Sequence, residues 1–224
     1  MDNNLYKSLF GIGLEDYLRQ KGNNNIYQET YILKIDFFVE NLPKEQKKIL
    51  KEKISKKKSE THAQHNDIFH EISIACAFYD KVNFLQENNK TKASDFCSNG
   101  IYIEVKTINN SNIERERQDE LNKGRHSEVS PALTQAETEK IKKEYIDCLG
   151  KKFTDHINKA KEQLNSRGGH IWVVYAIDSP PQFHEKIDKE VENKFDEIIK
   201  ELQTKNLCIR YINFESLREK IASL

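Results

Sequence analysis

Apolar residues recur at helical spacing in two central stretches of the chain. Between residues 61 and 79, four apolar positions fall at i, i+4, i+7 and i+11, on one face of a helix: Ile68, Ile72, Ala75 and Tyr79. The same spacing predicts a second helix, ended by Gly168 and Gly169: Phe153, Ile157, Ala160 and Leu164. Residues 134–149 and 183–203 also predict helices, and a short helix is expected after residue 212.

Other stretches follow the pattern of β-strands. Residues 171–177 read IWVVYAI, a nearly continuous apolar run whose length and β-branched content fit a strand buried on both faces. Residues 82–86 and 207–212 predict two further strands, and Asn99-Gly100 between alternating runs predicts a β-hairpin. The order of these elements indicates an α/β fold with a mixed β-sheet flanked by helices.

The first 58 residues are amphipathic in a less regular way. We expect an N-terminal helical region over residues 1–58, with a loop near residues 22–25, ahead of a core over residues 59–224. Residues 44–58 contain eight lysines and two glutamates. We favour a solvated helix face for this segment, with phosphate contact from the edge of the helix as the alternative.

The hairpin carries the residues with the clearest chemistry. If Asn99 and Gly100 form a two-residue turn, the flanking residues pair outward in order: Ser98 with Ile101, Cys97 with Tyr102, Phe96 with Ile103, and Asp95 with Glu104. Directly opposed side chains share one face of the sheet, with Cβ atoms roughly 4.5–5.5 Å apart, and alternation adds Lys106 to that face. The other face holds four apolar residues suited to a core: Phe96, Ile101, Ile103 and Val105.

Two carboxylates side by side repel each other, so this register needs a compensating interaction. A raised pKa would relieve the repulsion, and so would a divalent cation that binds oxygens of both side chains. Carboxylate oxygens suit Mg²⁺, which keeps several waters and shares its coordination shell with phosphate. A cation held by Asp95 and Glu104 would stabilise charge on a phosphoryl oxygen, with Lys106 placed to orient a water or hold the phosphate.

Asp95 is followed by eight residues and then by Glu104-Val105-Lys106. This spacing resembles the motif of the PD-(D/E)XK nuclease superfamily, which includes many restriction endonucleases. Ser94 stands where the family has the proline that names the motif. The resemblance covers residues 61–177 and leaves out the first 58 residues and the tail. It implies a restriction-endonuclease-like core.

The resemblance also implies roles for single residues. Asp95, Glu104 and the carbonyl of Val105 would bind Mg²⁺, for which Mn²⁺ substitutes. Lys106 would position the attacking water. Glu71, on the helix before the first core strand, would assist the metal, and its alternative is a solvent-facing helix residue. The implied protein is a type II restriction endonuclease that hydrolyses DNA phosphodiester bonds as a homodimer.

Several alternatives stay open. Gln163 matches the place of a supporting polar residue, but we favour an ordinary amide on a helix surface. The triplets Glu45-Gln46-Lys47 and Glu192-Asn193-Lys194 match the same glutamate-x-lysine pattern in charged helical stretches, so that pattern alone is not specific. A structure-specific or RNA-directed nuclease of the same fold is one alternative function. A non-catalytic nucleic-acid-binding protein is another.

Charge gives little support for nucleic-acid binding by the whole chain. The 36 basic and 36 acidic residues give zero net charge, so only their distribution can create a basic face. The long polar stretch over residues 109–130 carries four basic residues suited to phosphates or guanine edges: Arg115, Arg117, Lys123 and Arg125. A disordered, solvated loop is the alternative for this stretch.

The remaining metal-ligating residue types lack the spacing of a zinc site. We expect an ordinary helix surface for the clustered histidines, which are His62, His65 and His70. The four scattered cysteines indicate free thiols in a reducing cytoplasm: Cys76, Cys97, Cys148 and Cys208. We find no signal peptide and no apolar run long enough for a membrane span, so no membrane partner is expected.

Overall fold

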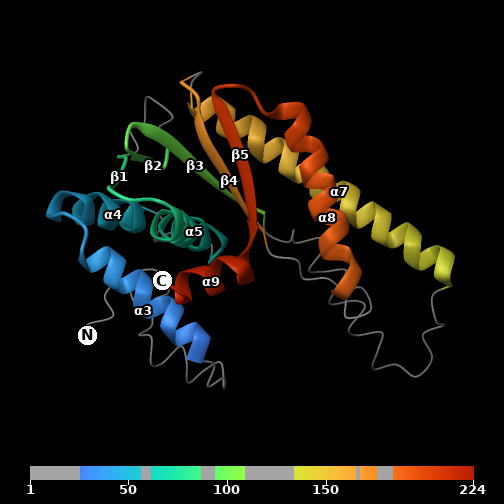
Figure 1. The fold of residues 1–224 in the computed structure, drawn as a ribbon, viewed down its shortest axis with the longest axis horizontal. Coiled ribbons are helices and arrows are strands. Elements are labelled where there is room, and N and C mark those ends of the chain that lie inside the picture. Colours follow the sequence, from blue (N-terminus) through green and yellow to red (C-terminus); the bar gives the residue numbers. More distant parts are fainter. Residues whose placement is uncertain (1–25, 57–61, 87–93, 109–133, 165–166, 176–183) are drawn as a thin grey trace.

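A five-stranded mixed β-sheet lies at the centre of the protein (Figure 1). The computed structural model describes residues 26–56, 62–86, 94–108, 134–164, 167–175 and 184–224. Within them the strands lie side by side in chain order: β1 (Val82–Phe84), β2 (Phe96–Ser98), β3 (Ile101–Ile108), β4 (Gly169–Tyr175) and β5 (Leu207–Asn213). The first three strands are antiparallel, and β3, β4 and β5 are parallel. The predicted α/β fold with a mixed sheet is therefore confirmed.

Six helices are described, and they cover both faces of the sheet (Figure 1). Their bounds are α3 (Ile26–Glu40), α4 (Lys44–Lys56), α5 (His62–Phe78), α7 (Gln135–Leu164), α8 (His184–Leu202) and α9 (Phe214–Ala222). The first three and α9 pack on one face, and α7 and α8 pack on the other. Among these helices, none is both long and apolar enough to cross a membrane.

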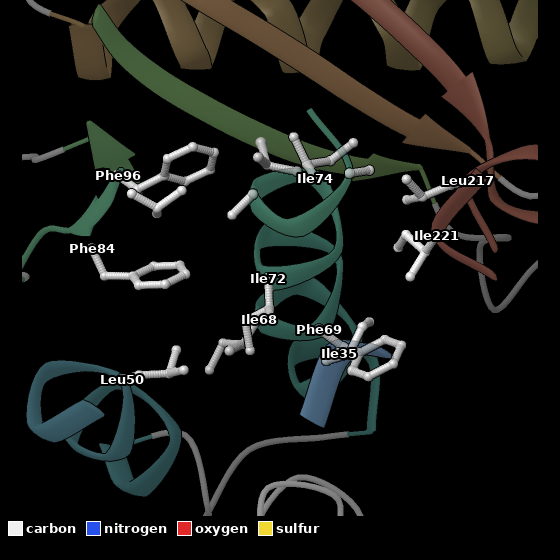
Figure 2. Close-up of a cluster of buried hydrophobic side chains, with 14 of the residues drawn as sticks. Ile35, Leu50, Ile68, Phe69, Ile72, Ile74, Phe84, Phe96, Leu217 and Ile221 are labelled. Atoms are coloured by element: carbon white, nitrogen blue, oxygen red, sulfur yellow. The ribbon is translucent and has the colours of Figure 1, made fainter. Parts of the chain in front are cut away.

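The larger hydrophobic core lies between the sheet and the helices α3, α4, α5 and α9 (Figure 2). Ile68, Ile72 and Ala75 of α5 are fully buried in it, as their helical spacing predicts. Figure 2 shows Leu50 of α4 directed toward α5, with Ile35 of α3 near the lower end of α5 in this view. Residues 26–40 and 44–56 are thus helical as expected, and both helices belong to this core. The predicted loop at residues 22–25 lies outside the described residues.

The strand β4 is buried on both faces, as its sequence predicts. Trp172 and Val174 belong to the larger core, whereas Ile171 and Val173 belong to the second core, under α7 and α8. Because successive side chains of a strand point to opposite faces, a strand between two helical layers needs apolar residues throughout. Residues 176 and 177 of the predicted strand lie outside the described residues.

Two expectations about the elements are wrong. The two helices expected over residues 134–149 and 153–164 are one helix, α7, over Gln135–Leu164. Gly150 does not break it, because an isolated glycine costs only about 1 kcal/mol in a helix and this one packs against Lys194 of α8. Ile101, expected in the core, is 40% exposed. It directly follows the turn, and the buried cluster on its face of the sheet ends at Ile103.

Candidate active site

The Asn99-Gly100 turn fixes the register of the hairpin. Both residues have positive φ angles, 49° and 80°, as the tight two-residue turn requires, and asparagine and glycine adopt them more readily than other residues. The observed pairs are Ser98 with Ile101, Cys97 with Tyr102 and Phe96 with Ile103. Three of the four predicted pairs are therefore confirmed.

The fourth predicted pair, Asp95 with Glu104, is wrong as a pair of opposed strand residues, because β2 begins at Phe96. The N–H of Asp95 donates to the carbonyl of Ile103 at 3.1 Å, so the chain departs from the regular ladder in the manner of a β-bulge. Its Oδ2 accepts the N–H of Val105 at 2.7 Å. The carboxylate of Asp95 therefore points to the edge of β3. It accepts the N–H of Val105, which in a longer β2 would donate to a backbone carbonyl of that strand.

Glu104 and Lys106 form a buried ion pair on the face of β3 that α7 covers. Glu104 is 0% exposed, and the Nζ of Lys106 donates to its Oε1 at 2.5 Å. The same ammonium donates to Oε1 of Gln163 on α7 at 2.6 Å. The predicted common face of Glu104 and Lys106 agrees with this contact. Gln163, which we expected to be an ordinary surface amide, is half-buried and holds the lysine in place.

A second buried ion pair comes from α4 and α5, which pack on the other face of the sheet. Glu71 of α5 is 4% exposed, which excludes the solvent-facing alternative. The Nζ of Lys53 on α4 donates to Oε2 of Glu71 at 2.7 Å and to the carbonyl oxygen of Asp95 at 3.3 Å. It also lies 3.9 Å from Oδ1 of Asp95. Asp95 thus lies within electrostatic reach of both ion pairs.

Lys53 is not among the predicted site residues, because the lysine-rich pattern of residues 44–58 favours a solvated or phosphate-binding helix face. Its neighbours on the helix contain a signal. Leu50 and Ile54, at i−3 and i+1, are both buried, which places Lys53 on the core-facing side of α4. A lysine at such a position needs a buried partner, and Glu71 is that partner.

Asp95 and Glu104 hold their protons more tightly than carboxyl groups in water do. Burial raises the pKa of Asp95 well above its ordinary value, and the charges of Glu104 and Glu71 raise it further. Burial also raises the pKa of Glu104 to about 7, although Lys106 lowers it in part. For Lys106, burial lowers the pKa, but Glu104 and Asp95 outweigh it, so the net pKa is raised. The cluster has three carboxylates, of Glu71, Asp95 and Glu104, but only two ammonium groups, of Lys53 and Lys106. When all five are ionised, the negative charges outnumber the positive ones.

One carboxylate oxygen in this cluster has no partner. Oε2 of Glu104 is buried and makes no hydrogen bond within the described residues. Leaving a buried polar group unsatisfied costs about 1–3 kcal/mol, and more if it is charged. An unpaired carboxylate oxygen close to a second carboxylate is a suitable ligand for a hard divalent cation.

The residues present fit a magnesium site with two carboxylates. The odd-numbered residues of β3 direct their backbone groups toward the β2 side, so the carbonyl of Val105 lies on the same edge as Asp95. In the described part of the chain, no group of three or more His, Cys, Asp and Glu side chains is arranged to hold a metal. Mg²⁺ needs no such group, because one or two carboxylates with water and phosphate complete its shell.

Two histidines lie close to this cluster. His156 precedes Gln163 by two helical turns on α7, and its Nδ1 is buried without a hydrogen bond in the described residues. Burial, Lys159 and Lys106 lower its pKa to about 4. His70 is buried, with Nδ1 2.9 Å from Oγ1 of Thr107, so the expected helix surface is wrong for this residue. The side chains of His62 and His65 lie outside the described residues.

The four residues predicted to contact nucleic acid lie outside the described residues: Arg115, Arg117, Lys123 and Arg125. The four cysteines are free thiols. Comparison of the chain with protein-family models, with curated proteins and with solved structures finds no match. The functional argument therefore depends on the geometry around Asp95 and Glu104.

Proposed function

We propose that the protein is a metal-dependent nuclease that hydrolyses DNA phosphodiester bonds at Asp95, Glu104 and Lys106. The observation that carries the proposal is the buried Oε2 of Glu104, which has no hydrogen-bond partner among the described residues and lies near the carboxylate of Asp95. In a purely structural role, a buried carboxylate with an unsatisfied oxygen and a second acid nearby would only destabilise the fold. A bound divalent cation gives this arrangement a function.

The arrangement of elements around the hairpin supports a restriction-endonuclease-like core. Glu71 lies on α5, the helix before the first strand, and its side chain reaches the cluster. Gln163 lies on α7, the helix after the hairpin, and contacts Lys106. Both are positions at which the resemblance to PD-(D/E)XK nucleases implies supporting residues.

Each residue of the cluster has a distinct chemical role in this proposal. Asp95, Glu104 and the carbonyl of Val105 would hold Mg²⁺, which supplies positive charge against the negative charge that develops on the phosphoryl oxygens. Lys106 stays protonated because its pKa is raised, so it donates hydrogen bonds to the attacking water or the phosphate and does not act as a base. Gln163 fixes the position of that ammonium.

The proposed substrate and assembly follow the resemblance. We infer a type II restriction endonuclease that acts as a homodimer, because two symmetry-related sites would each cut one strand of a duplex. Digestion of a plasmid with Mg²⁺ tests the substrate. Discrete bands indicate a fixed cut sequence, whereas cleavage of only branched DNA or of RNA indicates a different nuclease of the same fold.

Substitution of the cluster tests catalysis. Asp95→Asn keeps an oxygen for the N–H of Val105 but removes the charge, and Lys106→Met removes the ammonium. We expect each variant to lose at least about 100-fold of the Mg²⁺-dependent cleavage rate, since each removes a group aimed at the reacting atoms. Glu45→Gln, at the exposed glutamate of a glutamate-x-lysine triplet on α4, is the matched control and should cleave normally. Full activity of either cluster variant, with an unchanged circular dichroism spectrum, would refute the assignment.

A further inference from the structure

Lys53 places a positive charge in the cluster from a segment outside the region of family resemblance. It is 4% exposed, and its Nζ contacts Oε2 of Glu71 at 2.7 Å and the carbonyl oxygen of Asp95 at 3.3 Å. The helix that carries it is anchored, because Leu50 and Ile54 on the same side of α4 are 1% and 2% exposed. The ammonium is therefore held beside the carboxylates by the packing of α4.

We propose that Lys53 is a positioning residue whose ammonium neutralises Glu71 and limits the site to one divalent cation. The inference rests on the proposed function, in which Asp95 and Glu104 hold that cation. A cation shared by Glu71 and Asp95 would need the space between them, and Nζ of Lys53 lies there, 2.7 Å from one carboxylate and 3.9 Å from the other.

Charge counting supports a single cation. When all five side chains are ionised, three carboxylates and two ammonium groups leave one negative charge in the cluster (three minus two): Lys53, Glu71, Asp95, Glu104 and Lys106. One divalent cation turns this into one positive charge, which a phosphodiester group neutralises. A second divalent cation beside the Lys53 ammonium would leave a large uncompensated positive charge in a buried site, which is unfavourable.

Without the positive charge of Lys53, the charge balance of the cluster favours binding of a second divalent cation. Glu71 and Asp95 would then be two buried acids that have lost the ammonium lying near both of them. A divalent cation would replace the ammonium and bind oxygens of both. Lys53 thus has a role in metal stoichiometry, which a residue that only packs α4 against α5 would not have.

Titration of the protein with Mn²⁺, monitored by isothermal calorimetry, tests the inference. We expect the wild type to bind one Mn²⁺ per chain and Lys53→Met to bind two. Adding Glu71→Gln to Lys53→Met should return the stoichiometry to one, because the second cation loses its carboxylate. Lys51→Met, at an exposed position of the same helix, is the matched control and should bind one.

The outcomes separate this inference from the proposed function. A wild type that binds no Mn²⁺ refutes the proposed function, and the inference with it. A wild type that binds two, or a Lys53→Met variant that binds one, refutes only the role of Lys53. If Lys53→Met is unfolded without metal, refolding with two equivalents of Mn²⁺ supports the inference. Failure of saturating Mn²⁺ to restore its circular dichroism spectrum refutes it, because the divalent cation then cannot replace the ammonium.

Discussion

Glu104 gives the protein a pH dependence that can be traced to one residue. Burial raises its pKa from an ordinary value of 4.5 to about 7, so the folded chain binds this proton more tightly than the unfolded chain. A carboxyl group with a raised pKa stabilises the fold fully below the unfolded pKa, and this stabilisation is lost as the pH rises through the folded pKa. The raised pKa of Asp95 acts in the same direction.

We therefore expect the metal-free protein to lose stability as the pH rises from 5 to 8, by on the order of 3 kcal/mol from Glu104. Urea unfolding in EDTA at several pH values measures this slope. Glu104→Gln mimics the protonated side chain, so its free energy of unfolding should fall less over the same range. If the free energy of unfolding fell equally with pH in both proteins, the pKa of Glu104 would not be raised in the fold, and the prediction would be wrong.

At the scale of elements, the start of β4 depends on close contact with β3. Gly169 has a φ of 140°, and a Cβ there would lie 2.2 Å from the carbonyl oxygen of Tyr102. We expect Gly169→Ala to lower the free energy of unfolding by about 3 kcal/mol or more, because the strand would have to move away from β3. Thermal unfolding monitored by circular dichroism measures the change.

Gly150 provides a matched comparison within α7. A Cβ there would lie 3.2 Å from Cγ of Lys194, whose flexible side chain is 38% exposed and can move aside. Alanine is favoured over glycine in a helix by up to about 1 kcal/mol. Gly150→Ala should therefore leave the melting temperature unchanged or raise it. An equal loss of stability in Gly150→Ala and Gly169→Ala would contradict this reasoning, which expects a clash with backbone at Gly169 but only with a flexible side chain at Gly150.

At the scale of the whole molecule, the helices of the N-terminal region share a core with the sheet. Leu50 of α4 is 1% exposed within the cluster that also contains Ile72 of α5 and Phe96 of β2. We expect Leu50→Ala to lower the free energy of unfolding of the entire protein by about 2–5 kcal/mol. Leu33→Ala on α3, where the side chain is 39% exposed, should cost less than about 1 kcal/mol.

Differential scanning calorimetry distinguishes a shared core from separate folding units. A shared core predicts one transition, which Leu50→Ala moves to lower temperature as a whole. Two transitions, with only the smaller one shifted by Leu50→Ala, would indicate that residues 1–58 fold independently of residues 59–224.

Local sequence patterns are enough to predict most of the helices and strands and most of the hairpin. The helical spacing on α5 and the apolar run of β4 follow from local periodicity, which depends only on neighbouring residues. The register from Ser98–Ile101 to Phe96–Ile103 follows from the turn chemistry of Asn99-Gly100. These predictions are confirmed because backbone geometry is set by short-range interactions.

Which polar side chains meet depends on the packing of elements that are distant in the sequence. Lys53 contacts Glu71 across 18 residues of sequence, and Lys106 contacts Gln163 across 57 residues. Asp95 also leaves the ladder to accept the N–H of Val105. Such contacts depend on how α4, α5 and α7 pack on the two faces of the sheet, because burial removes water and forces each polar group to find a protein partner. Local sequence patterns can place Lys53 on the core-facing side of its helix, but they contain no information on which side chain it meets there.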